Sequence, residues 1–419
     1  MDRDTRARIA AWITGAGLAG STEPDLLRAF CAKLHAAGMP IAKANMLIDT
    51  LHPVYEGRVF LWRRDERDVD ILEYGRSDES DEAAESWRTS PFNHLFESGE
   101  DALRRRLPPD GELEFPILEK LRGAGQTDYL ALINRFAAEG IIGDMDCIYS
   151  SWTSDHADGF ADVHLEVLRE LVPSLALAMK CASLTRIAGT LVETYLGQDA
   201  GARVLSGRIA RGTADRISTV LWFSDLRGFT HITETAAPEA IIPLLNDYAE
   251  AVISSVHEAG GNVLKLIGDG TLAIFKGRDQ AAACHDALAA ESLMRERVAA
   301  LNEERSARGV PVTEPYLGLH VGDVFYGNIG SRDRLDFTVV GPAVNEASRI
   351  AALCRSAERN VLVSSVFHAA AAGADRDRLV SVGRYALRGV SRPQELFTLE
   401  SSDAEDTRSD ALSGVGRGG

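Results

Sequence analysis

Two aspartates stand where a carboxylate could do chemistry. Asp225 closes the hydrophobic part of F-S-D-L-R-G-F-T (223–230), and Asp269 lies in K-L-I-G-D-G (265–270) between two short apolar runs. Taken alone, the first is also a common helix-capping residue and the second is ordinary turn chemistry. If they lie on adjacent strand ends, the pair can hold two magnesium ions about 4 Å apart, the arrangement used for in-line displacement at phosphorus.

Two longer motifs follow these aspartates in the chain. G-L-H-V-G-D-V-F-Y-G-N-I-G occupies residues 318–330, and D-F-T-V-V-G-P-A-V-N-E-A-S-R occupies residues 336–349. Together with the aspartate motifs they resemble the catalytic domain of class III nucleotidyl cyclases over residues 213–400. The resemblance implies an α/β fold of the α+β sandwich type, with a ferredoxin-like catalytic domain that forms a cyclic nucleotide and pyrophosphate.

The resemblance assigns roles to the matching positions. Asp225 and Asp269 match the ligands of two Mg²⁺ or Mn²⁺ ions, and Lys265 and Thr338 match the pair that contacts the purine. Lysine only donates hydrogen bonds, so Lys265 suits the acceptor N1 of adenine, while the Thr338 hydroxyl can accept from the exocyclic amine. Guanine offers a donor at N1, so the pair predicts a preference for ATP over GTP.

A second group of positions matches residues that act on the ribose and the phosphates. Asn345 and Arg349 match the transition-state pair, in which Asn345 orients the ribose and Arg349 stabilises charge on the α-phosphate. Their i, i+4 spacing puts both side chains on one helix face. Arg332 and Arg388 are candidates for triphosphate contacts. The family often has lysine at the second position, and arginine keeps the charge there but changes the geometry.

The implied function is an adenylate cyclase, in which the 3′-hydroxyl of ATP attacks its own α-phosphate. A guanylate cyclase and a catalytically inactive, nucleotide-binding cyclase-like module are the alternatives. Active sites of the family span a dimer interface, and this chain carries both sets of residues. The resemblance therefore implies a symmetric homodimer with two shared sites.

Composition limits the other functions. The formal charge of −17 argues against general binding to nucleic acid or to an anionic membrane surface. The five scattered cysteines form no C-x-x-C pair, which fits a reducing compartment. The longest apolar stretch, Leu171 to Leu184, contains Pro173 and Lys180 and is too short to span a bilayer. With a charged N-terminus, these features predict a cytoplasmic protein.

A chain of 419 residues predicts two domains. Residues 1–180 mix helical and strand signals, and the strand S-S-W-T (150–153), a polar turn and a helix over 161–180 resemble the end of a GAF-type sensor domain. An unidentified small molecule or protein would be its signal. A structural α+β domain without a ligand is the alternative.

The segment 181–212 is expected to be a connecting helix that ends at Gly197. Its apolar residues recur at spacings of three and four, which favours a two-helix seam in a dimer, although a helix packed within its own chain has the same pattern. These residues are Leu184, Ile187, Leu191 and Tyr195.

The rest of the chain divides into the catalytic domain over 213–400 and a polar, glycine-rich tail over 401–419 that is expected to be disordered. Hydrophobic periodicity in the catalytic domain predicts a strand over 217–224, a helix over 238–259, a hairpin from 263–267 and 271–276, and a helix to 308. It then predicts strands near 316–321, 324–329 and 335–340, a helix over 343–354, a strand at 361–363 and a final pair of strands near 380–399.

Overall fold

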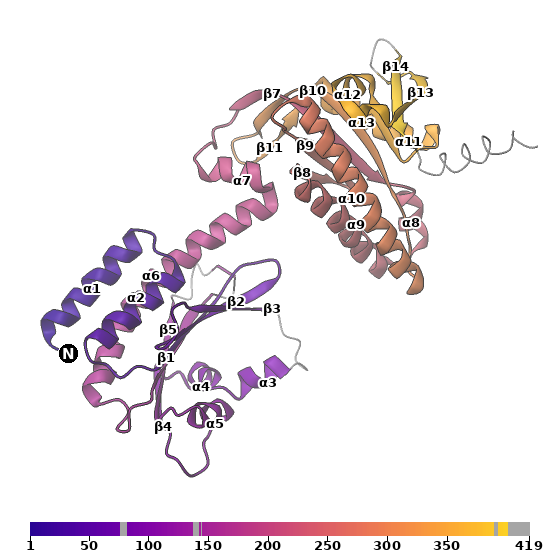
Figure 1. The fold of residues 1–419 in the computed structure, drawn as a ribbon. Coiled ribbons are helices and arrows are strands. Elements are labelled where there is room, and N and C mark those ends of the chain that lie inside the picture. The colour runs from indigo at the N-terminus through magenta and orange to yellow at the C-terminus, as the bar shows by residue number, and fades with distance from the viewer. Residues whose placement is uncertain (76–81, 137–141, 144, 389–392, 401–419) are drawn as a thin grey trace, which may run out of the picture. The chain divides into compact units, whose positions relative to one another are not determined.

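The computed structural model of the protein describes residues 1–75, 82–136, 142–143, 145–388 and 393–400. The chain divides into two compact units, Met1–Leu191 and Val192–Gly419, and each combines helices with a β-sheet (Figure 1). The expected α/β class is therefore confirmed. The tail expected at 401–419 lies outside the described residues.

The second unit is built around an eight-stranded sheet. Its elements in chain order are α7 (Gln198–Leu205), β7 (Ala214–Leu226), α8 (Phe229–Thr235), α9 (Pro238–Glu258), β8 (Asn262–Ile267), β9 (Gly270–Phe275), α10 (Gln280–Ala307), β10 (Pro315–Gly330), β11 (Leu335–Val340), α11 (Pro342–Ala357), β12 (Val361–Ser364), α12 (Ser365–Ala370), α13 (Gly373–Asp377), β13 (Leu379–Tyr385) and β14 (Gln394–Leu399). The predicted hairpin and the predicted long helices are confirmed.

Four strands of this sheet have the ferredoxin-like order. β10, β7, β9 and β8 lie side by side in that sequence, and each neighbouring pair is antiparallel. Since α9 connects β7 to β8 and α10 connects β9 to β10, the chain follows the βαββαβ path of that fold. Alternate residues of β7 serve opposite faces: Val220 and Trp222 pack with α9 and α10, and Leu221 packs with α11.

One expected strand break does not occur. The sequence pattern predicts separate strands near 316–321 and 324–329, whereas β10 is a single strand. β10 stays paired with β7 through Gly322, which is in register with Thr219. Hydrogen bonding along a neighbouring strand therefore overrides the local turn preference.

The helix α11 lies very close to β10. A Cβ at Gly318 would be 2.5 Å from the backbone nitrogen of Ala351 and 2.6 Å from the carbonyl oxygen of Ala347, so any side chain at this position would push the helix off the sheet. The contact fixes the height of α11 above the sheet. It therefore also fixes where the helix presents Asn345 and Arg349.

The first unit contains a six-stranded antiparallel sheet in the order β3-β2-β1-β6-β5-β4. Its elements are α1 (Arg3–Leu18), α2 (Glu23–Ala36), β1 (Lys43–Asp49), β2 (Tyr55–Arg63), β3 (Asp70–Gly75), α3 (Glu82–Arg88), α4 (Pro91–Ser98), β4 (Ala102–Arg106), α5 (Pro116–Gly123), β5 (Asp128–Arg135), β6 (Cys147–Ser154) and α6 (Asp162–Leu196). The helices α1, α2 and α6 cover one face of the sheet, and α4 and α5 cover part of the other.

The helix α6 joins two helices that the sequence predicts separately. It contains the helix expected over 161–180 and continues into the connecting segment, where it ends directly before Gly197, as expected. By length and composition it could cross a membrane, but one such helix is weak evidence. Eleven of its residues are buried against the rest of the first unit, as in the core helix of a globular domain.

The apolar stripe of the connecting segment packs mostly within its own chain. Ile187 is 1% exposed, and Leu184 and Leu191 pack against the core of the first unit. Tyr195, in contrast, is 81% exposed. The first part of the stripe is thus occupied by intramolecular packing, which is the alternative to the dimeric seam.

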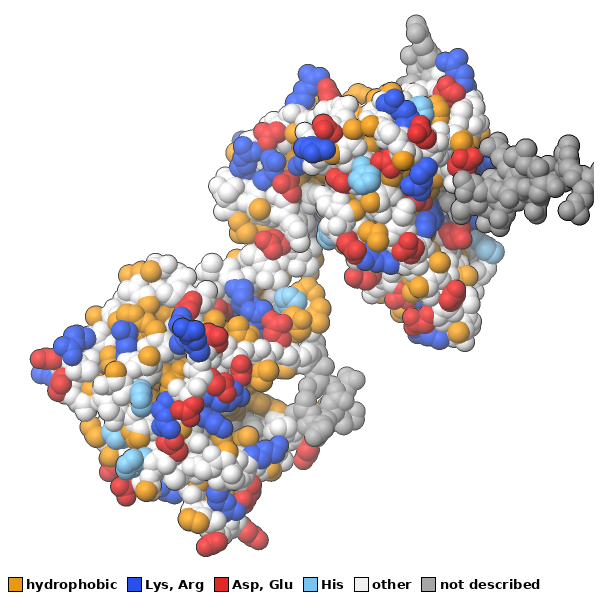
Figure 2. All heavy atoms as spheres, in the orientation of Figure 1, with side chains coloured by type: hydrophobic (Ala, Val, Ile, Leu, Met, Phe, Trp, Pro, Cys, Tyr) orange, Lys and Arg blue, Asp and Glu red, His pale blue; other side chains and the backbone are white. Residues whose placement is uncertain are grey.

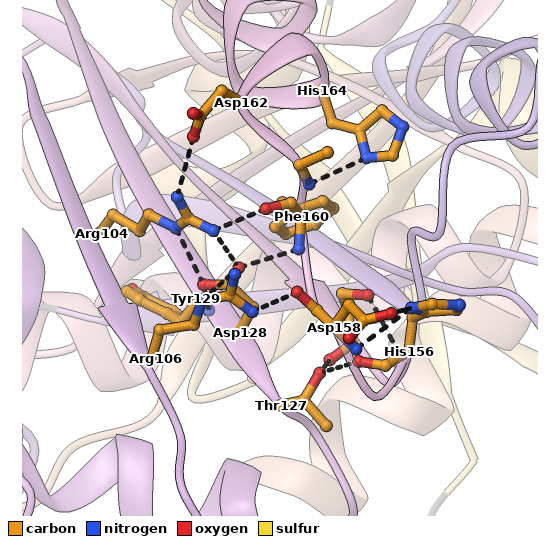
Figure 3. A network of polar contacts seen from close by, with 12 residues as sticks. Arg104, Arg106, Thr127, Asp128, Tyr129, His156, Asp158, Phe160, Asp162 and His164 are labelled. Carbon is orange, nitrogen blue, oxygen red and sulfur yellow. Dashed lines mark hydrogen bonds and ion pairs between the residues drawn. The ribbon is translucent and has the colours of Figure 1, made fainter.

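A buried carboxylate holds β5 to the loop that precedes α6 (Figure 3). Asp128 is 0% exposed and accepts hydrogen bonds from the Arg104 guanidinium (2.8 Å) and from the backbone N–H groups of Tyr129 (3.0 Å) and Phe160 (2.9 Å). Arg104 also donates to the Phe160 carbonyl at 2.6 Å, and the guanidinium of Arg106 lies 3.6 Å from Asp128. The charge is therefore both paired and hydrogen-bonded, as burial requires.

Replacing Asp128 by alanine should cost about 3–5 kcal/mol of the first unit's stability, because it leaves a partly buried guanidinium and two N–H groups unpaired. The matched control, Asp101→Ala, removes the exposed partner of Arg135 and should cost less than about 1 kcal/mol. Urea unfolding followed by tryptophan fluorescence measures both, because four of the five tryptophans, Trp12, Trp62, Trp87 and Trp152, lie in this unit. Equal losses in the two variants would contradict a special role for Asp128.

Candidate functional site

The two predicted metal ligands lie side by side. Asp225 is the penultimate residue of β7, and Asp269 stands in the tight turn between β8 and β9. The backbone N–H of Leu226 donates to a carboxylate oxygen of Asp269 at 3.2 Å, which ties the hairpin tip to the end of β7. The approach requires glycine at position 270, because a Cβ there would be 2.7 Å from the carbonyl oxygen of Ser224.

The two carboxylates crowd one another. Although solvent reaches its side chain, partial burial, a hydrogen bond with Asp269 and the charge of Asp269 together raise the pKa of Asp225 to about 6. Two charged carboxylates this close repel one another, so a cation bound between them would lower this pKa. Oxygen ligands of this kind suit Mg²⁺ and Mn²⁺. Among the described residues no group of three or more His, Cys, Asp or Glu side chains is placed to hold a metal ion, and the predicted ligands form a pair.

A cavity of about 970 Å³ opens beside the two aspartates. Its wall includes residues 227–230 of the β7–α8 turn and start of α8, and the C-terminal end of α11 with the residues that follow it. From that end come two arginines, Arg355 and Arg359, which the sequence patterns did not single out. The cavity thus has acidic and basic groups on its lining, an arrangement suited to metal ions and a polyanion together.

The backbone at the end of α11 is unusual. Glu358 has φ of 53° and ψ of 43°, and among the described residues it is the one non-glycine residue with positive φ. This left-handed residue ends the helix, and the N–H of Arg359 bonds back to the carbonyl of Cys354 at 3.0 Å. Neither Arg355 nor Arg359 forms an ion pair within the described ranges. Both charges therefore remain available to a ligand.

The two predicted purine contacts belong to a different part of the sheet. Lys265 lies on β8 and forms an ion pair with Asp336, the residue two places before Thr338 on β11. Thr338 itself is 8% exposed. Residues two apart on a strand point to the same face, so Asp336 links Lys265 to the face that carries Thr338. The structure thus brings the predicted purine pair into one neighbourhood.

Asn345 and Arg349 share one face of α11, as predicted. Asn345 is exposed and Arg349 is half-buried, and neither side chain has a hydrogen bond or ion pair to another described residue. Asn345 precedes Arg355 by ten residues, which is about 15 Å along a helix. The lining of the aspartate cavity accordingly includes neither of them, nor Lys265 or Thr338.

The other two arginine candidates are also separate from the aspartates. Arg332 is exposed in the turn between β10 and β11, and Arg388 is exposed after β13, next to undescribed residues. Neither lines the aspartate cavity. One chain therefore holds two groups of predicted site residues: the aspartates in one cavity, and the purine and transition-state residues elsewhere.

Comparison with known proteins decides which family this site belongs to. Residues 213–401 match the family model of the adenylate and guanylate cyclase catalytic domain. This part of the chain is a class III nucleotidyl cyclase domain. The match begins at Thr213, one residue before β7, and ends after β14, so it includes every predicted site residue. It supports the formation of a cyclic nucleotide from a nucleoside triphosphate, a reaction for which class III cyclases generally use Mg²⁺ or Mn²⁺.

Individual proteins resemble the cyclase domain at modest identity. An adenylate cyclase of Anabaena cylindrica is 36% identical over 157 residues, which are 36% of this chain and 30% of the Anabaena protein. The crystal structure of the adenylyl cyclase CyaB from P. aeruginosa is 28% identical, covers 45% of this chain and 97% of that one, and superposes with a TM-score of 0.41. The guanylyl cyclase Cya2 is also 28% identical, covering 45% and 96%, with a TM-score of 0.39. The chain thus spans about a third of the Anabaena protein's length.

The paired aspartates predict metal binding that can be measured without turnover. Asp225→Asn and Asp269→Asn should each weaken Mn²⁺ binding by about tenfold or more, because each removes one charged oxygen ligand. Electron paramagnetic resonance of free Mn²⁺ reports the binding directly. Glu303→Gln, at an exposed position on α10, is the control and should bind Mn²⁺ normally. Unchanged Mn²⁺ affinity in either aspartate variant would remove that residue from the site.

Proposed function

We propose that this protein is an adenylate cyclase, a homodimer that converts ATP to 3′,5′-cyclic AMP and pyrophosphate in the cytoplasm. The observation that carries the proposal is the pairing of Asp225 with Asp269, inside a cyclase domain, beside a cavity that also presents Arg355 and Arg359. The bond between the α-phosphorus and the oxygen leading to the β-phosphate breaks as the 3′-oxygen bonds to the α-phosphorus. The hydroxyl proton passes to water.

In this proposal, the acidic residues of the cavity bind metal ions and the basic residues bind the phosphates. Asp225 and Asp269 would hold two Mg²⁺ or Mn²⁺ ions, which when bound would lower the pKa of the ribose hydroxyl and neutralise phosphate charge. Arg355 and Arg359 would bind the β- and γ-phosphates, which become the pyrophosphate leaving group, through charge-assisted hydrogen bonds. Arg332 and Arg388 are further candidates for triphosphate contacts.

Substrate choice would rest on Lys265 and Thr338. The ammonium group can donate to N1 of adenine, and the Thr338 hydroxyl can accept from the exocyclic amine. Asp336 holds Lys265 beside β11 before substrate arrives, which reduces the entropy lost on binding. The similar protein of Anabaena cylindrica is an adenylate cyclase, which agrees with the substrate proposed for this chain.

The separation of the two residue groups supports a shared active site. Asn345 and Arg349 would act in the site of the partner subunit, since their own chain's cavity does not include them. In a C₂ dimer each chain would then contribute aspartates to one site and transition-state residues to the other.

Regulation by the first unit would pass through α6 and α7. Ala200 of α7 is 0% exposed in a core that also contains Leu221 of β7, so α7 is part of the catalytic unit rather than a free linker. A shift of α6 would therefore reach the central strand through packed side chains. The resemblance of the first unit to GAF domains stays a prediction.

A product assay with purified protein tests the substrate. ATP should give cyclic AMP with a kcat/KM about tenfold or more above that for GTP, since guanine N1–H meets no acceptor on Lys265. Equal values for ATP and GTP would contradict the assignment of adenine, and no product from either would favour the inactive module.

Arg355→Met and Arg359→Met should each weaken inhibition by inorganic pyrophosphate by about tenfold, because each removes a charged donor. Inhibition by adenosine should stay the same, since it carries no phosphate. Arg308→Met, at an exposed site at the end of α10, is the matched control. If pyrophosphate inhibited the cavity variants and the control equally well, the two arginines would not bind phosphate.

The shared site predicts complementation. Asp225→Asn and Asn345→Ala proteins should each be nearly inactive. After subunit exchange they should regain up to about a quarter of wild-type activity, because half of randomly paired dimers are mixed and each mixed dimer has one intact site. Product formation measures this, with exchange verified by differently labelled subunits. No recovery after verified exchange would place each active site within one chain.

A further inference from the structure

The covered face of the first unit's sheet changes character along its strands. Toward one end, the side chains on the face under α4 and α5 are apolar and form a small core. Toward the other end, the same face carries Lys43 and Asn45 on β1, and Ser151 and Thr153 on β6, with Lys43 in register with Thr153 and Asn45 with Ser151. Polar side chains on the inner face of a covered sheet need a reason.

These residues form the floor of a cavity of about 180 Å³. Phe92 of α4 and Ile117 and Leu121 of α5 are on its lining together with the polar side chains of Ser86, Thr89, Ser90 and Lys120, so the cavity has both apolar and polar walls. For scale, an apolar protein cavity of about 150 Å³ holds benzene. The space is thus suited to a ligand with one ring or a short carbon chain.

Two observations indicate what the cavity would bind. The side-chain oxygen of Asn45 is buried and has no hydrogen-bond partner, which leaves an acceptor in need of a donor. Lys43 and Lys120 both line the cavity, and neither forms an ion pair in the described part of the chain. The cavity therefore presents an unused acceptor together with unused positive charge.

We propose that this cavity binds a small organic acid that also carries a hydrogen-bond donor. The carboxylate would lie against Lys43 and Lys120, the donor would satisfy Asn45, and the carbon skeleton would contact Phe92 and Leu121. The site rests on the first unit alone and does not depend on the proposed cyclase activity. In a cyclase regulated by that unit, such an acid would be the signal.

Three matched probes test the two recognition elements on the full chain: 4-hydroxybenzoate, which has both the acid and the donor, benzoate, which lacks the donor, and 4-hydroxybenzamide, which lacks the charge. Isothermal titration calorimetry should show 4-hydroxybenzoate binding about tenfold or more tightly than either analogue. The double variant Lys43→Met, Lys120→Met should lose the preference for the acid over the amide. Asn45→Leu should lose the preference for the hydroxylated acid over benzoate.

Lys33→Met, at a position on α2 outside the cavity, is the matched control and should bind all three probes as the wild type does. Circular dichroism and the Mn²⁺ affinity of the second unit verify that each variant is folded. The proposal is overturned if 4-hydroxybenzoate does not bind at millimolar concentration, if all three probes bind equally, or if the lysine and asparagine variants keep the wild-type preferences.

Discussion

The second unit, which contains the cyclase domain, depends on one strand, β7, which is hydrogen-bonded along both edges. β10 pairs with it on one side and β9 on the other, and its side chains are buried on both faces of the sheet. A strand held in this way has no freedom to slip, because a shift of one residue would exchange its two faces. The end of β7 is therefore a fixed point, and Asp225 stands there. β9 pairs with the same strand, and this pairing places Asp269 of the β8–β9 turn beside Asp225. Partial burial and the neighbouring Asp269 together raise the pKa of Asp225.

The helix α11 is held in a fixed position on the same sheet. Close contact at Gly318 holds the helix against β10, and its two ends serve different purposes. Near its N-terminus it presents Asn345 and Arg349, away from the aspartates of its own chain. At its C-terminus the left-handed Glu358 closes the helix where Arg355 and Arg359 line the aspartate cavity. Strained backbone of this kind is often found at binding sites, and here it lies beside the proposed phosphate contacts. In the proposed dimer, this helix would carry residues of two different active sites.

The two faces of the first unit's sheet differ from one another. Charged side chains lie over the outer surface of this unit (Figure 2). One face is a large apolar core completed by α6, and the other face is part core and part polar cavity. The buried Asp128 and its arginine partners hold the loop before α6 to β4 and β5, so the start of α6 is tied to the same sheet that forms the floor of the cavity. Residues 184–191 of α6 continue to pack on this unit, and the chain then enters the catalytic unit through α7. The chain thus connects the sheet that carries the cavity to the central strand of the second unit through two helices, α6 and α7, which are separated at Gly197.

The sequence alone determined the elements whose signals are local. The i, i+4 spacing of Asn345 and Arg349 predicted their common helix face, and the glycine turn between two apolar runs predicted the hairpin that carries Asp269. Family motifs, rather than periodicity, supplied the roles of these residues, and the match over residues 213–401 confirms the family. Only the tertiary structure could show where strands continue and which way side chains pack, because residues distant in sequence determine both. The strand β10 continues across Gly322 because β7 supplies hydrogen bonds there, and Leu184, Ile187 and Leu191 pack inward because the first unit offers an apolar surface. No local sequence pattern identifies Arg355 and Arg359 as site residues. They line the cavity of the paired aspartates because the fold brings α11 beside β7 and the left-handed Glu358 ends the helix there.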